Sequence, residues 1–169
     1  MFATLYLVAT GAGTARRLPE LLPELIPLTT QVLTVLTPNT TRIVSPRELA
    51  LVPGHRLVAC YFDSAILPRP PEGVVLVAPC DFNSLNKLAS GIADNLALSI
   101  TTEAIGRKTP VIVALSCNTP LWNHPRARQS ADTLASWGCV VLEPVAGLHG
   151  HTMVDTAAIV RAVASALAV

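Results

Sequence analysis

Residues 74–98, VVLVAPCDFNSLNKLASGIADNLAL, combine two patterns that decide the fold class. The run Val74–Ala78 is apolar at every position, which is typical of a strand buried on both faces of a parallel sheet. The stretch Asn83–Leu98 carries apolar residues at near-helical spacing and predicts a helix. These residues are Leu85, Leu88, Ile92 and Leu96. A buried strand followed by a helix indicates one unit of an α/β fold.

The same alternation recurs along the chain. Further strands are predicted at Leu5–Ala9, Gln31–Leu36, Val111–Leu115 and Cys139–Leu142, and further helices at Arg126–Trp137 and Asp155–Leu167. We therefore predict an α/β fold, a Rossmann-like, doubly wound parallel sheet of the flavodoxin type, in a single domain over residues 1–169. Ligands are expected beyond the carboxyl ends of the strands of such a sheet.

Two regions fit this pattern less well. Pro19, Pro23 and Pro27 interrupt the first helical segment, and because an internal proline removes a backbone donor and clashes with the preceding turn, that helix should be short or kinked. The region 38–71 contains one possible strand, Arg56–Tyr61, and otherwise gives no assignment.

The composition limits the class of protein. Of the 169 residues, 51% are hydrophobic and only 14% charged, so we expect part of the surface to be covered by other copies of the chain. No apolar run approaches the roughly 20 residues of a membrane span, and no basic segment precedes the first apolar run, so a cytoplasmic protein with no membrane partner is predicted. The net charge of +1 gives no reason to expect a nucleic-acid partner. The four cysteines lack metal-ligand spacing, so buried thiols and no metal site are expected.

A loop of small residues, Gly11-Ala12-Gly13-Thr14, follows the first predicted strand. Free backbone N–H groups in such a loop, ahead of a helix, favour a bound phosphate. The third glycine of the dinucleotide fingerprint is absent, since Arg16 stands in its place, so an ordinary tight turn explains the loop equally well.

The segment Ala78–Leu96 resembles the homo-oligomeric flavin-containing cysteine decarboxylases, whose loop has the form A-P-A-S/T-A-N-T followed by K-L-A-x-G-I-A-D-N-L. Asn83 corresponds to the asparagine that contacts the flavin, and Ser84 replaces the threonine. The resemblance implies that FMN is the cofactor. It implies as cofactor-binding residues Gly11, Ala12, Gly13, Thr37, Pro79, Asn83, Ser84, Asp94 and Ser99, although Thr37 is also explained as a plain turn residue.

A second segment, residues 110–125 (PVIVALSCNTPLWNHP), resembles the family's substrate-recognition motif P-x-M-N-x-x-M-W, with Cys117 and Leu121 in place of the two methionines. The resemblance implies that Cys117, Asn118 and Trp122 bind the substrate. Asn118 is also a catalytic candidate, because a side-chain amide can donate to a carboxylate without adding a charge. Alternatively, Asn118 only caps the turn before Pro120.

Two departures from the family bear on catalysis. The catalytic histidine of the family, in a His-Ile pair, corresponds here to Ala65-Ile66, and His55 could replace it only through a different loop path. The family's mobile segment often carries an acidic cysteine, whereas Gly147–Met153 contains two histidines instead. We predict that His149 is catalytic, with His151 as the alternative proton relay, while a solvated loop explains both residues as well.

The function that follows is FMN-dependent oxidative decarboxylation of a cysteine to an enethiol. The substrate would be a peptide with a C-terminal cysteine, or another small thiol-carboxylate. The alternatives are a flavin-binding subunit or regulator without this activity, and a flavin reductase on the same scaffold. The resemblance also implies a homo-oligomer, either a trimer or a dodecamer built from trimers.

Overall fold

The computed structural model describes residues 4–70 and 72–168. Six parallel strands form the central sheet in the order β3-β2-β1-β4-β5-β6. The strands are β1 Thr4–Ala9, β2 Gln31–Leu36, β3 His55–Leu57, β4 Gly73–Cys80, β5 Val111–Leu115 and β6 Val140–Leu142. The chain starts in the middle of the sheet, extends to one edge through β3, and returns to build the other half from β4. This order confirms the predicted Rossmann-like, doubly wound sheet.

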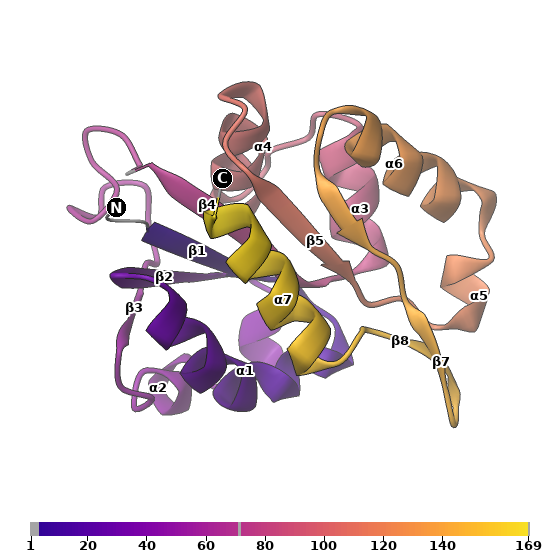
Figure 1. The fold of residues 1–169 in the computed structure, drawn as a ribbon, viewed down its shortest axis with the longest axis horizontal. Coiled ribbons are helices and arrows are strands. Elements are labelled where there is room, and N and C mark those ends of the chain that lie inside the picture. Colours follow the sequence, from indigo (N-terminus) through magenta and orange to yellow (C-terminus); the bar gives the residue numbers. More distant parts are fainter. Residues whose placement is uncertain (1–3, 71, 169) are drawn as a thin grey trace.

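Helices cover both faces of the sheet (Figure 1). The longer helices are α1 Leu18–Leu25, α3 Phe82–Ala89, α4 Leu96–Gly106, α6 Pro125–Ser136 and α7 Thr156–Leu167, and the short ones are α2 Pro46–Leu49 and α5 Thr119–Trp122. Single turns of 3-10 helix occur at Gly13–Arg17, Ile26–Leu28 and Thr40–Arg42. A separate antiparallel hairpin, β7 Val145–Gly147 and β8 Gly150–Thr152, projects from the sheet beside α5.

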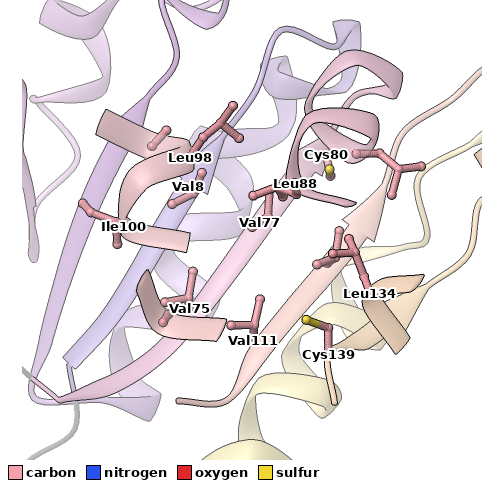
Figure 2. Close-up of a cluster of buried hydrophobic side chains, with 14 of the residues drawn as sticks. Val8, Val75, Val77, Cys80, Leu88, Leu98, Ile100, Val111, Leu134 and Cys139 are labelled. Atoms are coloured by element: carbon pink, nitrogen blue, oxygen red, sulfur yellow. The ribbon is translucent and has the colours of Figure 1, made fainter. Parts of the chain in front are cut away.

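Each face of the sheet has its own hydrophobic core, because successive side chains of a strand point to opposite faces. Tyr6 and Val8 of β1 pack on the side of α3, α4 and α6, whereas Leu5 and Leu7 pack on the side of α1 and α7. Figure 2 shows the first core, in which Val75, Val77 and Val111 of the strands face Leu88, Leu98 and Leu134 of the helices. The apolar runs of β1, β4 and β5 are thus buried on both faces, as their composition predicted.

The proline-rich first helix is short, as predicted. The helix α1 contains Pro19 in its first turn and Pro23 inside it, and it lasts only eight residues before a 3-10 turn that contains Pro27. Its buried face consists of leucines that pack against the second core: Leu18, Leu21, Leu22 and Leu25.

The prediction of one helix over Asn83–Leu98 is wrong. The helix α3 ends at Ala89, and Gly91 adopts a left-handed conformation with φ of 71°. Glycine reaches this region without steric cost, so it ends the helix there. The side chain of Asn95 then accepts the N–H of Leu98 and starts α4 as a new helix. In consequence Ile92, which the spacing placed in the predicted helix, lies between α3 and α4 and is 45% exposed.

Smaller corrections concern the ends of elements. The possible strand Arg56–Tyr61 is β3, which starts at His55 and ends at Leu57, and β6 begins at Val140 rather than at Cys139. The segment predicted as a glycine-flanked loop is the hairpin β7–β8. Within the described residues, no helix combines the length and the apolar character needed to cross a membrane.

Candidate active site

Two pockets lie beyond the carboxyl ends of the parallel strands, where a doubly wound sheet holds its ligands. The larger has a volume of about 560 Å³ and is lined by the loops after β1, β4 and β5 and by β8. The smaller, of about 190 Å³, lies between the loop after β2, the start of α3 and the residues before α4. Asp81 and Asn83 line both pockets, so the two join at the beginning of α3.

A hydrogen-bond network fixes the ends of β1 and β4 beside these pockets. The buried Thr10 hydroxyl donates to the Pro79 carbonyl at 2.9 Å and accepts the N–H of Asp81 at 2.7 Å. Asp81 in turn accepts the N–H of Ser84 at 2.7 Å and caps α3. Pro79, predicted to bind the cofactor, lies outside both pocket linings and supports the loop from behind. Sequence reasoning did not identify Thr10 or Asp81.

The glycine loop forms one wall of the larger pocket. Gly11, Ala12 and Gly13 all line it, and Thr14 bonds to Ser116 of the loop after β5 with a distance of 2.7 Å between the two hydroxyl oxygens. A Cβ on Gly11 would lie 2.7 Å from the Cβ of Asn39, so this close approach requires glycine. The loop leads into a 3-10 turn and only then into α1.

The smaller pocket is polar and contains one cation. Lys87 forms an ion pair with Asp94, with 2.5 Å between Nζ and Oδ2, and this hydrogen bond from Lys87 lowers the pKa of Asp94 below its usual value. Ser84, buried at the start of α3, and Thr37 also line the pocket. The Thr37 hydroxyl donates to Thr40, because Thr40 uses its own proton on the Ala9 carbonyl. Thr37 therefore faces the pocket as an acceptor.

Ser99, predicted to bind the cofactor, lies outside both pocket linings. It lies in α4, and its hydroxyl bonds to the Ala93 carbonyl at 3.2 Å and to the Tyr61 hydroxyl at 2.6 Å. It lines neither pocket, so its role in this chain is to hold the segment at Tyr61 against α4.

Asn118 and Cys117 lie in the larger pocket at the end of β5. The Asn118 Oδ1 accepts the N–H of Leu121 at 3.1 Å and caps α5, which leaves its Nδ2 group facing solvent in the pocket. The expected cap is therefore present, and it does not use the amide donor. Burial, and next the negative charge of Asp81, raise the pKa of Cys117 to about 11, so Cys117 is a neutral thiol at physiological pH.

Trp122 is buried, with 1% of its surface exposed, and lies behind the pocket wall rather than in its lining. The guanidinium of Arg128 lies 4.1 Å from the centroid of the Trp122 ring. In the isolated chain this tryptophan supports α5 and, through it, Asn118, so direct contact with a substrate is not favoured.

The histidines differ sharply in their positions. His151 on β8 lines the larger pocket, and its ring Nδ1 lies 3.0 Å from the Thr119 hydroxyl. His149 is exposed in the turn of the hairpin and is not part of the lining. His55 lies at the start of β3, outside both pocket linings. Its two ring nitrogens bond to the Thr34 hydroxyl and to the Leu49 carbonyl. The different loop path that would bring His55 to the site is therefore not present.

Ala65, which stands in the position of the family's histidine, packs against the first core and lines neither pocket. All four cysteines are free; Cys80, Cys117 and Cys139 are buried as predicted, whereas Cys60 is exposed. Over residues 4–70 and 72–168, no three His, Cys, Asp or Glu side chains gather in a way that could hold a metal ion.

Comparison with known proteins assigns the family. The Flavoprotein family matches residues 3–168, almost the whole chain. The chain belongs to this family. A mouse phosphopantothenoylcysteine decarboxylase is 31% identical to this flavoprotein over 161 residues, and the match covers 83% of this chain and 75% of the relative. The bifunctional coenzyme A biosynthesis protein CoaBC of Thermococcus kodakarensis is 26% identical over 144 residues; the match covers 82% of this chain but only 36% of that protein.

Solved structures agree with this flavoprotein's fold. A PPC decarboxylase in complex with pantothenoylaminoethenethiol superimposes with a TM-score of 0.81 at 22% identity, covering 95% of this chain and 96% of the other. The peptidyl-cysteine decarboxylase EpiD superimposes with a TM-score of 0.79 at 22% identity, covering 96% of this chain and 99% of the other. The FMN-dependent cysteine decarboxylase SpaF superimposes with a TM-score of 0.78 at 24% identity, covering 97% of each chain. The resemblance to the flavin-containing cysteine decarboxylases is confirmed, and with it the prediction of a flavin.

The joined pockets suit such a cofactor. A flavin nucleotide has a flat aromatic ring at one end and a phosphate at the other, joined by a hydroxylated chain. The smaller pocket offers the cation of Lys87 and the start of α3 to an anion. The larger one offers the flat backbone of Gly11–Gly13 and the apolar side chains of Phe82 and Leu121 to a ring.

Proposed function

We propose that this flavoprotein is an FMN-dependent decarboxylase that oxidises a cysteine carrying a free carboxylate, and that the physiological substrate is a peptide with a C-terminal cysteine. The observation that carries the proposal is the free Nδ2 group of Asn118 in the larger pocket, an uncharged donor for the carboxylate. The chain would act as one flavoprotein domain over its 169 residues.

The proposed cofactor contacts follow from the two pockets. Asn83, Ser84 and Lys87 would hold the phosphate end of FMN, with Asp94 keeping Lys87 in position. Gly11, Ala12 and Gly13 would lie against the ring, instead of holding the phosphate that the sequence predicted for this loop, and Thr37 would accept a hydroxyl of the connecting chain. Pro79 and Ser99 would contribute indirectly, by holding the loops that carry these groups.

FMN bound there would supply the hydride acceptor for oxidation of the substrate's Cβ, and the resulting thioaldehyde would lose carbon dioxide to leave an enethiolate. Asn118 orients the carboxylate before this loss, and Phe82 and Leu121 limit the access of water to it. Trp122 fixes α5 from behind, while Cys117 stays protonated and adds no charge near the sulfur. His151 is proposed as the imidazole that contacts the substrate's sulfur, in place of the His149 predicted from the sequence.

The charges of the larger pocket favour a substrate with no phosphate beside its thiol, and a peptide that ends in cysteine is such a substrate. Neither Lys nor Arg is found among the residues that line the larger pocket, and its fixed charge is the carboxylate of Asp81. A substrate with a phosphate near the thiol would have no cation there to compensate it. The altered recognition motif, with Cys117 and Leu121 in place of methionines, also supports a peptide substrate.

The test is to incubate the FMN-loaded protein with peptides that end in cysteine and to record the product masses. Loss of carbon dioxide and two hydrogens from a peptide, but not from the same peptide with a C-terminal amide, is the expected result. Peptides ending in serine are the matched control for the thiol. If the protein modifies phosphopantothenoylcysteine and no peptide, the peptide substrate is wrong but the decarboxylase remains.

A second candidate function is a flavin-binding subunit or regulator without decarboxylation. The observation that favours it is Ala65, which replaces the histidine of the family and lies outside both pockets. Bound FMN together with unchanged masses for every thiol-carboxylate tested would support this function. Flavin-dependent oxidation of NADH or NADPH would instead support a flavin reductase.

We also propose that the protein is a homo-oligomer, with a trimer or a dodecamer built from trimers as the expected forms. Apolar side chains between β3 and β4 support this, since Phe62 is 85% exposed, Tyr61 49% and Leu67 47%. Sedimentation velocity of the wild type and of Phe62→Ser tests it. A monomeric wild type would exclude the proposal, and a shift of the variant toward smaller species would locate the contact.

A further inference from the structure

The hairpin β7–β8 is bonded to α5 by the side chain of Thr119. The Thr119 Oγ1 accepts the backbone N–H of His151 at 2.9 Å and lies 3.0 Å from the Nδ1 of the same histidine. Gly150 allows this approach, because a Cβ there would lie 2.6 Å from Oγ1 and the residue has φ of 108°. One threonine therefore contacts both the backbone and the ring of the imidazole that lines the larger pocket (Figure 1 shows β8 beside α5).

The one proton and two lone pairs of Oγ1 allow either direction for the second bond, and the nearby Nδ1 favours donation by the hydroxyl. A threonine hydroxyl has one proton to donate, and its oxygen here already accepts the N–H of His151. In the described part of the chain, Nδ1 is the acceptor within reach of that proton. The Thr119 hydroxyl then donates to Nδ1, and a neutral ring carries its own proton on Nε2.

We infer that Thr119 is a positioning residue that holds His151 as the Nε2–H tautomer, so that the ring offers the pocket a hydrogen-bond donor and not a base. The catalytic consequence of this inference rests on the proposed function. The Nε2–H of His151 would stabilise the substrate's sulfur as a thiolate before oxidation and as an enethiolate afterwards. No proton is transferred to or from His151 in this role. The pocket lining holds two other titratable groups, Asp81 at the N-cap of α3 and Cys117 after β5, and neither supplies a positive charge to the thiolate.

The direct test is nitrogen NMR of the FMN-loaded protein with ¹⁵N-labelled histidine rings, at a pH well above that at which imidazole titrates. Comparison with His151→Gln assigns the signals of His151. We expect its Nε2 to be protonated and its Nδ1 unprotonated in the wild type. A ring protonated on Nδ1 would overturn the inference, since His151 would then present a base.

Thr119→Val removes the hydroxyl at constant shape and should give a mixture of both tautomers, while Thr119→Ser should restore the Nε2–H form. Unchanged tautomers in Thr119→Val would also overturn the inference. If the valine variant does not fold, the ring protonation of His151 in the wild type and in the serine variant still tests the inference. The NMR measurement needs no turnover, so it stays decisive even if the protein decarboxylates nothing. With an active substrate, Thr119→Val should lower kcat/KM about tenfold or more, and Thr119→Ser should recover it.

Discussion

The Asn118 Oδ1 accepts the backbone N–H of Leu121 at 3.1 Å, so the structural and the proposed catalytic roles of this side chain use different atoms. Asn118→Asp keeps an acceptor at the cap of α5 but removes the Nδ2 donor and adds a negative charge. We expect kcat/KM to fall by about 10²- to 10³-fold, with little change in thermal stability.

Asn118→Ala is the matched variant, because it removes both functions. It should lose activity and also cost about 1 kcal/mol of unfolding free energy, the usual value of a helix cap. Thermal melts and kinetics of the two variants, measured together, separate the roles. An active Asn118→Asp would show that the amide does not bind the substrate's carboxylate.

The two histidines of the hairpin should differ in their effect on activity. His151 lines the larger pocket, whereas His149 is exposed in the turn between β7 and β8. We expect His151→Leu to reduce kcat/KM on the order of 10²-fold, the cost of a lost donor at the reacting atoms, and His149→Leu to remain near the wild type. Steady-state kinetics with one substrate check this. A larger loss in His149→Leu would mean that the hairpin turns inward when the substrate binds.

Lys87 should set the preference for FMN over riboflavin. It is the cation of the smaller pocket, and Asp94 holds it in place. A charge-assisted hydrogen bond to phosphate contributes about 1.5 to 3 kcal/mol, so Lys87→Gln should weaken FMN binding by about 10- to 100-fold and leave riboflavin binding unchanged. Titrations followed by flavin fluorescence measure both constants. Arg47→Gln, which removes an exposed charge from α2, is the control. Equal losses for both flavins would place the phosphate elsewhere.

The thiol of Cys117 should react slowly and respond to Asp81. Burial and then the carboxylate of Asp81 raise the pKa of Cys117 to about 11, so thiolate is scarce at neutral pH and increases as the pH rises toward that value. Asp81→Asn retains the cap of α3 but removes the charge, and each unit by which the pKa falls increases the thiolate fraction about tenfold. Alkylation rates at Cys117, read by peptide mapping in a Cys60→Ser background, should therefore increase. Glu143→Gln, a carboxylate outside the pockets, should have no effect.

The sequence predicted the sheet better than the helices. The strands β1, β2, β4 and β5 were located to within two residues, because strands buried on both faces are apolar throughout. The helix over Asn83–Leu98 was wrong since its leucine spacing continues across a break. Gly91 and the cap at Asn95 outweigh that periodicity, and both signals were visible in the sequence.

The site was predicted only in part, for a physical reason. The resemblance located Gly11, Asn83 and Asn118, which line the pockets, because each stands in a recognisable motif. The bonds of Thr10 to the loop after β4, and of Thr119 to the hairpin, join residues far apart in the chain and leave no local pattern. Burial was equally invisible in the sequence: Trp122, which the resemblance implied as a substrate-binding residue, is buried behind the pocket wall.

The most direct test of the central claim is a single anaerobic turnover. The FMN-loaded protein is mixed without oxygen with a peptide that ends in ¹³C-carboxyl-labelled cysteine, while flavin absorbance and released carbon dioxide are recorded. The account predicts that the visible absorbance of the oxidised flavin is lost and that about one equivalent of labelled carbon dioxide appears per flavin. An oxidised flavin that persists, with no labelled carbon dioxide from cysteine-terminated peptides or from smaller thiol-carboxylates, would contradict it.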